Sequence, residues 1–313
     1  MIRKILTVAL AVTGLMFGSA MQAKAETVIV VTTQNQLFSF DSATPGTTTV
    51  PVAISGLVSG SETIVGLDRR PTNGLIYGVS SQGRIYTINE TSGAATLVST
   101  ISGATLSGGV FGVDFNPAAD SAGLSSLRIT NNGAGVNQNL AVNVATGVAT
   151  VQTPLAYAAG DPNFGQNPNV AGSAYSNNVN GATSTSLYDL DTNLGALVTQ
   201  NPAPSGQLST VGSLGVNSSG VLGFDVSGLT GIAYAALNPN DGFSNLFTIN
   251  LSTGTATLVG QIGSGFLIRG LTTQIGQAAP VPEPATMILL GTGLAGIAAK
   301  ARRRRQTRKD EAA

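Results

Sequence analysis

The sequence predicts an all-β protein that folds as a closed five-bladed β-propeller. Three observations predict it: a strand–turn–strand unit recurs through residues 26–280, its copies lie about 50 residues apart, and the repeat region begins and ends with incomplete copies that complement each other. Each period supplies four short strands, the size and strand count of a propeller blade. The 40 glycines suit many tight turns, and no amphipathic helix of useful length occurs between residues 26 and 280.

Two elements make up each period. The first is an apolar strand, a Ser/Thr-Gly turn and a second strand, found clearly at residues 84–98, 139–151 and 245–259 and more weakly from Leu37 and Leu187. The second is a short apolar run closed by Gly-x-Asp. It occurs as Gly66-Leu67-Asp68, Gly112-Val113-Asp114 and Gly223-Phe224-Asp225, is echoed by Arg269-Gly270-Leu271, and has Gly172-Ser173-Ala174-Tyr175 in the remaining place.

The two ends of the repeat region predict how the ring closes. The first copy starts with the strand at 28–31 and lacks a Gly-x-Asp strand, whereas the last copy is followed by a surplus strand at 268–272. Pairing of these two strands lets residues 27–53 and 266–275 share one blade, and it removes two exposed sheet edges. A β-sandwich or an open solenoid is the alternative. A six-bladed ring is the nearest variant, because residues 200–216 are long enough to add strands.

The N-terminus has the three parts of a signal peptide, predicted to span residues 1–25. Arg3 and Lys4 precede an apolar run at 5–17, and Ala23 and Ala25 are the small residues that a signal peptidase recognises. We therefore expect cleavage before Glu26. A retained N-terminal anchor is the alternative, although the apolar run is short for a membrane span.

The C-terminus predicts a sorting signal and an anchor that follow the repeat domain (26–277). A linker at 278–284 contains Pro282, Glu283 and Pro284, and the apolar segment 285–299 predicts a transmembrane helix of about 22 Å. The tail at 300–313 contains four consecutive arginines, Arg302, Arg303, Arg304 and Arg305, which should stay cytoplasmic and leave the repeat domain outside.

This C-terminal segment resembles the PEP-CTERM sorting signal of Gram-negative and related bacteria. The resemblance implies recognition by an exosortase, a membrane enzyme similar to cysteine transpeptidases, with cleavage near Pro282-Glu283-Pro284. It also implies export in organisms that make exopolysaccharide. Signal peptidase, exosortase and the membrane are thus the expected partners, with an extracellular polysaccharide or protein as a candidate ligand. An ordinary single-span anchor is the alternative.

The composition excludes several kinds of chemistry. The chain has no His, Cys or Trp, so it has no imidazole base, cysteine nucleophile, thiolate zinc site or disulfide. Residues 26–280 contain 5 Arg, no Lys and 12 Asp plus Glu, a net charge of −7, which excludes Ser-Lys chemistry there and argues against nucleic-acid binding.

A family resemblance covers nearly all of residues 28–275. The segments GLDRRPTNGLIYGV, GVDFNPAADSAGLSSLRITNNGAGVNQNLAVNVATG and NLFTINLSTGTATLVG, together with GSAYSNN and LYDLDTN, resemble an uncharacterised bacterial domain-of-unknown-function family, DUF4394. The resemblance implies a propeller-like, often exported domain and brings no activity with it. An insertion at 118–123 departs from the repeat.

Three aspartates are weak candidates for a metal site. Asp68, Asp114 and Asp225 hold equivalent places in the repeat, so in a ring they could line the channel or one rim and, with Asn116 nearby, bind a hard cation such as Ca²⁺. A hydrogen bond from each carboxylate to its own turn backbone explains the three residues without a ligand. On the sequence alone we therefore assign no metal, no cofactor and no catalytic residue.

Other polar and aromatic residues have structural explanations. Asp189 and Asp191 alternate on one strand, where a solvated face is a simpler explanation than a glycosidase pair. Arg69 and Arg70 predict ion pairs at the rim. Four aromatic residues are expected to pack between blades: Tyr77, Tyr86, Tyr188 and Phe247.

The expected function is binding or structural rather than enzymatic. The polar loops at 161–169 and 201–206 are the first candidates for a binding surface, because long loops on a rigid scaffold tend to bind ligands. We therefore expect an exported surface or matrix protein. The alternative is a carboxylate-dependent glycoside hydrolase, which needs a carboxylate pair in a concave pocket with an aromatic wall and a raised pKa on one member.

Overall fold

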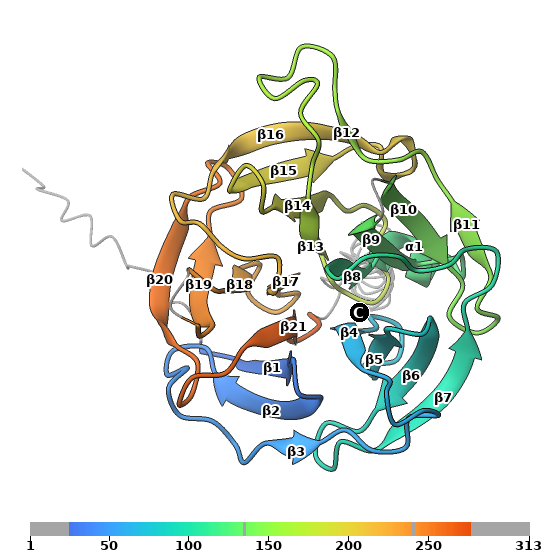
Figure 1. The fold of residues 1–313 in the computed structure, drawn as a ribbon, viewed down its shortest axis with the longest axis vertical. Helices are drawn as coiled ribbons and strands as arrows, with labels where there is room; N and C mark the ends of the chain where they lie inside the picture. The colour runs from blue at the N-terminus through green and yellow to red at the C-terminus, as the bar shows by residue number, and fades with distance from the viewer. Residues whose placement is uncertain (1–24, 134–135, 240–241, 277–313) are drawn as a thin grey trace, which may run out of the picture. The chain divides into compact units, whose positions relative to one another are not determined.

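Five sheets surround a central axis in the structure, a computed structural model that describes residues 25–133, 136–239 and 242–276 (Figure 1). This arrangement confirms the five-bladed propeller and its all-β class. The chain divides into a compact unit that ends at Gly276 and a second unit, Gln277–Ala313, which lies outside the described residues.

Each blade has its strands in order from the axis outwards. Blade 1 contains β21 (Ile268–Thr272), β1 (Thr27–Thr32), β2 (Gln36–Asp41) and β3 (Val52–Ala53). Blade 2 contains β4 (Ile64–Arg69), β5 (Ile76–Ser80), β6 (Arg84–Ile88) and β7 (Ala95–Thr100). Blade 3 contains β8 (Phe111–Phe115), β9 (Leu127–Gly133), β10 (Val136–Val142) and β11 (Ala149–Val151).

The last two blades follow the same order, except that blade 4 has an additional outer strand. Blade 4 contains β13 (Val170–Tyr175), β14 (Leu187–Asp191), β15 (Ala196–Gln200), β16 (Gln207–Ser213) and β12 (Ala156–Tyr157). Blade 5 contains β17 (Gly223–Val226), β18 (Ala233–Leu237), β19 (Asn245–Ile249) and β20 (Ala256–Gln261).

The ring closes through the first and last strands of the described chain. β1 pairs antiparallel with β21, with Val30 opposite Leu271, and this pairing confirms the predicted closure. The innermost strand of blade 1 therefore comes from the end of the repeat region, whereas its other strands come from the beginning. Blade 1 thereby joins sequence positions more than 200 residues apart, and β1 is paired on both sides, with β2 and β21.

The extra length near residue 200 adds a strand rather than a sixth blade. β12 pairs in parallel with β16 at the outside of blade 4, and a short 3-10 helix, η1 (Ala203–Ser205), connects β15 to β16. The repeat copy expected to start at Leu187 is misplaced by one strand. Leu187 begins β14, the second strand from the axis, whereas the strands at Arg84 and Asn245 are third.

The insertion at 118–123 forms most of a short helix, α1 (Pro117–Ser121). Asn116 caps it by accepting a hydrogen bond from Ala119 N at 2.9 Å, and Pro117 occupies the first turn, where no backbone donor is needed. Asp120 is buried and ties the helix to blade 2 through Arg70 Nε at 2.7 Å and the Thr72 hydroxyl at 2.6 Å. The insertion therefore braces the joint between blades 2 and 3.

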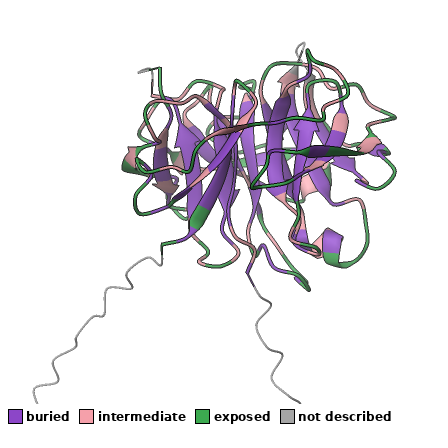
Figure 2. Ribbon diagram, turned by 90° about the horizontal axis from the view of Figure 1, so that it is seen from below, coloured by how far each residue is buried: buried purple, intermediate pink, exposed green. Residues whose placement is uncertain are grey.

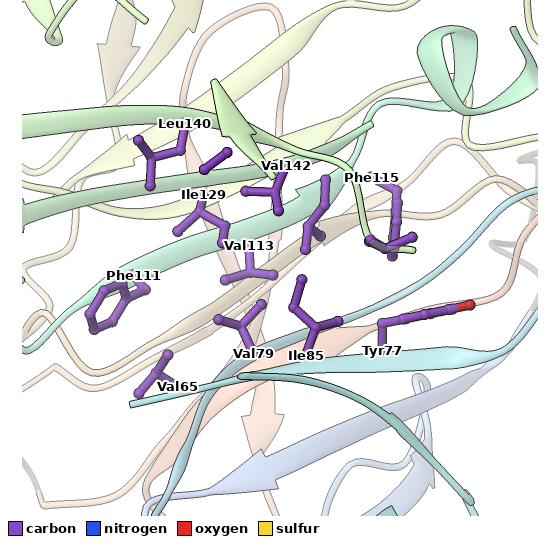
Figure 3. Packing of buried hydrophobic residues seen from close by; sticks show 13 residues of the cluster. Val65, Tyr77, Val79, Ile85, Phe111, Val113, Phe115, Ile129, Leu140 and Val142 are labelled. Atoms are coloured by element: carbon purple, nitrogen blue, oxygen red, sulfur yellow. The ribbon is translucent and has the colours of Figure 1, made fainter. Parts of the chain in front are cut away.

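Apolar side chains fill the space between neighbouring blades. Figure 3 shows Val79 and Ile85 of blade 2 facing Val113 and Ile129 of blade 3. The rings of Tyr77 and Phe115 meet edge to face with centroids 5.4 Å apart. Tyr77, Tyr86 and Phe247 are buried and Tyr188 packs against the core of blades 4 and 5, as predicted. Figure 2 shows that burial is greatest in the strands and that exposed residues lie mainly in the loops.

A glycine on every innermost strand allows the next blade to approach. A Cβ added to Gly66 would lie 2.5 Å from the side chain of Val113, and one added to Gly112 would lie 2.3 Å from the Ser173 hydroxyl. The same close approach recurs around the whole ring, in the pairs Gly172–Phe224, Gly223–Leu271 and Gly270–Leu67. The glycine of the Gly-x-Asp element is thus required by blade packing.

The targeting segments cannot be compared with the structure. Ala23 of the cleavage motif, the predicted transmembrane helix at 285–299 and the arginine cluster lie outside the described residues, and Ala25 is the first residue inside them. Within the part of the chain that is described, no helix is long and apolar enough to cross a membrane.

Candidate functional site

The aspartates of the Gly-x-Asp element lie together at the propeller axis. Asp68, Asp114 and Asp225 stand on β4, β8 and β17, two residues after the glycine of each innermost strand, and are at most 1% exposed. Ala174 and Thr272 hold the same position on β13 and β21. The five innermost strands therefore present three carboxylates, one hydroxyl and one methyl group at one level.

Each carboxylate accepts a backbone hydrogen bond from the next blade. Asp68 Oδ2 accepts from Phe115 N at 2.9 Å, Asp114 Oδ2 from Tyr175 N at 2.7 Å and Asp225 Oδ2 from Thr273 N at 2.7 Å. The expectation that each aspartate bonds to its own turn is therefore wrong in the main, although Asp68 also accepts from Arg69 N at 2.6 Å and a backbone hydrogen bond from Val226 lowers the pKa of Asp225. The sequence could not indicate partners that come close only when neighbouring blades pack together.

The three carboxylates form the one cluster of potential metal ligands found among the described residues. One oxygen from each of Asp68, Asp114 and Asp225 lies within 4.8 Å of the other two. Asp114 Oδ1 and Asp225 Oδ1 are buried and have no hydrogen-bond partner. None of the three takes part in an ion pair with a described residue. The structure thus brings the three candidates together, while Asn116 caps α1 instead.

Burial raises the pKa of all three carboxyls, and repulsion from neighbouring carboxylates adds to it at Asp114 and Asp225. Burial raises the pKa of Asp68 to about 6, against the hydrogen bonds from Phe115 and Thr272 that lower it. Burial and the charge of Asp68 raise the pKa of Asp225 to about 8. Burial and the charges of Asp68 and Asp225 raise the pKa of Asp114 well above its ordinary value. The cluster therefore favours a state with fewer than three negative charges unless a cation is present.

The prediction of a solvated face for Asp189 and Asp191 is wrong, because both side chains are fully buried. Asp189 Oδ1 accepts from the Ser173 hydroxyl at 2.6 Å, and burial raises the pKa of this carboxyl to about 7. Asp191 accepts from the Tyr157 hydroxyl and from Asn193 N at 2.8 Å, so it ties β12 and the β14–β15 turn to the blade. Both residues have structural partners within blade 4.

The two rim arginines form the predicted ion pairs. Arg69 contacts Glu90 with 2.5 Å between Nη2 and Oε2, and Arg70 contacts Asp120. Arg70 also lies 5.8 Å from the ring centroids of Tyr77 and Phe115. Both guanidinium groups are thus occupied by neighbours in the fold, which confirms the structural explanation.

The loop at 201–206 forms one wall of a pocket of about 310 Å³ between blades 3 and 4. The rest of its lining comes from Asn116, Tyr175, the segment at 185–187, and Thr199 and Gln200. No charged side chain lines it, and its polar groups are hydroxyls and amides. The sequence indicated the loop but not the remaining walls, because these come from three segments that only the fold brings together.

The loop at 161–169 is pinned to blade 4. Asp161 Oδ2 accepts from Thr210 N at 2.6 Å, and Asn163 Nδ2 donates to the Thr210 hydroxyl at 2.9 Å.

A further pocket of about 360 Å³ lies between blades 1 and 2, with Glu90 as its one acidic residue. A small cavity also lies at the axis, where residues of the innermost strands such as Gly66, Val113 and Arg269 line it. No pair of carboxylates lines this cavity or either of the two pockets.

Comparison with known proteins identifies both parts of the chain. The model of the family Domain of unknown function (DUF4394) matches residues 36–272, and the PEP-CTERM protein-sorting motif matches residues 280–305. No curated protein matches the sequence.

Several solved structures resemble the propeller at low identity. A Bacteroides thetaiotaomicron protein of unknown function has a TM-score of 0.43 at 15% identity, over 79% of this chain and 63% of that chain. A Bacteroides uniformis protein proposed to be a 6-phosphogluconolactonase has a TM-score of 0.40 at 14% identity, over 77% and 83%. TolB from Acinetobacter baumannii has a TM-score of 0.39 at 12% identity, over 75% and 53%.

Proposed function

Because the chain belongs to the DUF4394 family and carries a PEP-CTERM sorting motif, we propose that it is an exported surface protein whose propeller binds neutral carbohydrate without turning it over. Export and sorting to the cell surface follow from the motif. The ligand class and the lack of turnover are the proposal. The observation that supports it is the pocket walled by the loop at 201–206.

The chemistry of this pocket suits a neutral ligand rich in hydroxyl groups. Its lining combines the side chains of Thr185, Ser186 and Thr199 with the amide of Asn201 and the apolar faces of Pro202 and Pro204. Hydroxyls and amides both donate and accept hydrogen bonds, which is what sugar hydroxyls require. A charged ligand would find no opposite charge in the lining. A volume of about 310 Å³ lies at the lower end of the range for small-molecule sites.

The position of the pocket on a rigid frame supports binding. β15, which brings Thr199 and Gln200 to the pocket, is paired on both sides, with β14 and β16. β13, which brings Tyr175, is the innermost strand of blade 4 and pairs with β14. The loop at 201–206 is tied back through Ala203 O, which accepts from Asn139 Nδ2 at 2.9 Å. A preformed site loses less conformational entropy when it binds a ligand.

Calorimetry tests the proposal by measuring whether the purified chain binds the exopolysaccharide of its host and neutral oligosaccharides made from that polysaccharide. Ser186→Trp places a large ring in the pocket at an exposed position, and we expect it to weaken binding by roughly tenfold or more. Thr91→Trp, which makes the same change in the pocket between blades 1 and 2, is the matched control and should bind normally. Equal affinity in both variants contradicts the proposed site.

A carboxylate-dependent glycoside hydrolase is the second candidate. The pKa values of Asp189, at about 7, and Asp225, at about 8, are in the range of a general acid, which favours it. Both side chains are fully buried, however, and a general acid must reach the substrate oxygen. Release of reducing ends from the polysaccharide, lost in Asp189→Asn or Asp225→Asn, would establish hydrolysis in place of binding alone.

A further inference from the structure

We propose that the three aspartates at the propeller axis, Asp68, Asp114 and Asp225, bind one Ca²⁺ ion that holds blades 2, 3 and 5 together. The site is separate from the carbohydrate pocket and does not depend on it. Three features of the cluster lead to it: the spacing of its oxygens, the two oxygens left without hydrogen-bond partners, and the lack of an ion pair between the cluster and any described residue.

The spacing suits an ion of the size of calcium. Three oxygens that are each within 4.8 Å of the others lie on a sphere no larger than 4.8 Å divided by √3, so a central ion would be at most about 2.8 Å from each. This upper limit allows the distance of about 2.3–2.6 Å at which Ca²⁺ binds oxygen. Mg²⁺ demands near-octahedral geometry and usually keeps several waters, which suits a cluster of fully buried carboxylates less well.

The hydrogen bonds leave oxygens available for an ion. Asp114 and Asp225 each use Oδ2 to accept from the next blade, and their Oδ1 atoms are buried without a partner. A buried carboxylate oxygen with neither a donor nor a cation is costly. The Thr272 hydroxyl, 2.9 Å from Asp68 Oδ1 and 3.5 Å from Asp225 Oδ2, places one more oxygen beside them.

No ion pair neutralises the cluster within the described residues, although Arg128 stands opposite Asp114 on β9 and donates instead to Tyr175, Asn139 and Gln152. The ion pairs of the described chain lie elsewhere, at Arg69–Glu90, Arg70–Asp120 and Arg84–Glu62. Arg269 lines the small cavity at the axis, but its guanidinium donates to the Thr63 hydroxyl at 3.2 Å and forms no ion pair with the cluster. A divalent ion would relieve the repulsion among three buried carboxylates whose oxygens lie within 4.8 Å of one another.

Ala174 explains why the cluster has three members rather than more. It is the residue of β13 at the aspartate position, and its methyl group adds no charge. Together with Thr272 it leaves the ring with a formal charge of −3 at this level, which one Ca²⁺ reduces to −1. Five carboxylates at the same positions would need more than one divalent ion to reach a similar charge.

The direct test is the metal content of the full-length purified chain. The protein is dialysed against calcium-containing buffer and then against metal-free buffer, and we expect elemental mass spectrometry to find about one Ca²⁺ per chain. Calcium should also raise the unfolding temperature of chelator-treated protein. Protein that retains no ion, and whose unfolding temperature is unchanged by millimolar Ca²⁺, overturns the proposal. A preference for Mg²⁺ over Ca²⁺ overturns it as well, because Mg²⁺ keeps waters that this buried cluster does not accommodate.

Two variants show whether a loss of calcium binding is specific to this site or follows from the loss of any buried carboxylate. Asp114→Asn keeps an oxygen that can accept from Tyr175 N but removes one negative charge, and it should weaken calcium binding by roughly tenfold or more. Asp189→Asn changes another fully buried carboxyl with a raised pKa that is outside the cluster, and calcium binding should stay as in the unmodified chain. Equal loss in both variants contradicts the assignment. If Asp114→Asn fails to fold, the metal content of the unmodified chain still decides the question.

Discussion

The backbone N–H of Tyr175 donates to Asp114 Oδ2 at 2.7 Å and joins the innermost strands of blades 3 and 4. The same kind of contact joins blades 2 and 3 through Asp68, blades 5 and 1 through Asp225, and blades 1 and 2 through the Thr272 hydroxyl. At the joint between blades 4 and 5, Ala174 has no acceptor to offer. In blades 2, 3 and 5 the Gly-x-Asp element therefore connects the blade to the next one: the glycine admits the neighbouring strand and the aspartate accepts a hydrogen bond from its backbone.

Thr272→Val tests the hydrogen bonds at the joint where the ring closes. Valine keeps the shape of threonine but loses the hydroxyl that accepts from Arg69 N at 3.0 Å and donates to Asp68 Oδ1 at 2.9 Å. Because these groups are buried, we expect the free energy of unfolding to fall by about 1–3 kcal/mol. Urea denaturation measures the loss.

Thr257→Val is the control for that substitution. Thr257 is exposed on β20, so the same change should alter the free energy of unfolding by no more than about 0.5 kcal/mol. A similar loss in both variants would mean that the hydroxyl at the closing joint contributes nothing specific.

Gly112→Ala tests the close approach of the blades. The added methyl group would lie 2.3 Å from the Ser173 hydroxyl and 2.7 Å from Ser173 N, so the innermost strands must move apart. Overpacking of this kind costs about 1–3 kcal/mol of unfolding free energy. In Gly109→Ala the methyl group meets nothing within 4 Å, so thermal unfolding of this control should match the unmodified chain. Equal stability of Gly112→Ala and Gly109→Ala would contradict the packing role.

Much of the fold could be predicted from the sequence because each blade repeats the same local signals. The turn between β10 and β11 shows why: Asn143 Oδ1 accepts from Ala145 N and Thr146 N, and Gly147 has φ +75°. Such turns depend on a few neighbouring residues, so they are visible in the sequence. The offset ends then predicted the pairing of β1 with β21.

The same local chemistry explains the error in blade 4. Asp191 Oδ1 accepts from Asn193 N and Leu194 N, and Gly195 has φ +56°, so this turn resembles the one after β10. It connects the second strand to the third, however, and an outer strand, β12, is added to the sheet. A local turn signal does not state which strand of a blade it follows.

The candidate site was harder to predict than the fold. The equivalence of Asp68, Asp114 and Asp225 was visible as a repeat, but their partners belong to neighbouring blades about 50 residues away along the chain. The burial of Asp189 was missed for the same reason, because Ser173, which donates to it, lies on the adjacent strand of a sheet whose register only the fold defines.

Replacement of Pro282, Glu283 and Pro284 with alanine tests the role of the sorting motif, which matches residues 280–305. If an exosortase recognises these residues, the variant should stay in the membrane fraction as uncleaved protein, whereas the unmodified chain should be processed. Immunoblots of cell fractions measure both. Replacement of Gln277 with alanine, just outside the matched segment, is the control and should leave processing normal. Unchanged processing of the triple variant would leave the segment as an ordinary anchor.

The buried carboxyls also predict how stability depends on pH. In chelator-treated protein the pKa values of Asp68, Asp189 and Asp225 are about 6, 7 and 8, because burial raises them from the ordinary 3.8. Between about pH 4 and pH 8 the folded chain therefore binds more protons than the unfolded chain, and the free energy of unfolding must fall as the pH rises. Burial works against ionisation of Glu62 and Asp161, but the hydrogen bonds to these carboxylates outweigh it and lower their pKa values. These two groups therefore stabilise the fold above about pH 4, and they change the free energy of unfolding mainly below the range of pH 4 to pH 8.

Denaturant titrations of chelator-treated protein from pH 4 to pH 8 measure this slope. Asp189→Asn should make it shallower, because the variant lacks one group that takes up a proton on folding, and Asp41→Asn, at an exposed position, should leave it unchanged. Saturating Ca²⁺ should raise stability most at pH 8, since the ion competes with protons for the same three carboxylates and the competition weakens as the protons leave. If the free energy of unfolding of chelator-treated protein rises between pH 5 and pH 8, these carboxyls are ionised in the folded chain without a cation. That result contradicts the raised pKa values, and it also contradicts the need for an ion at the axis.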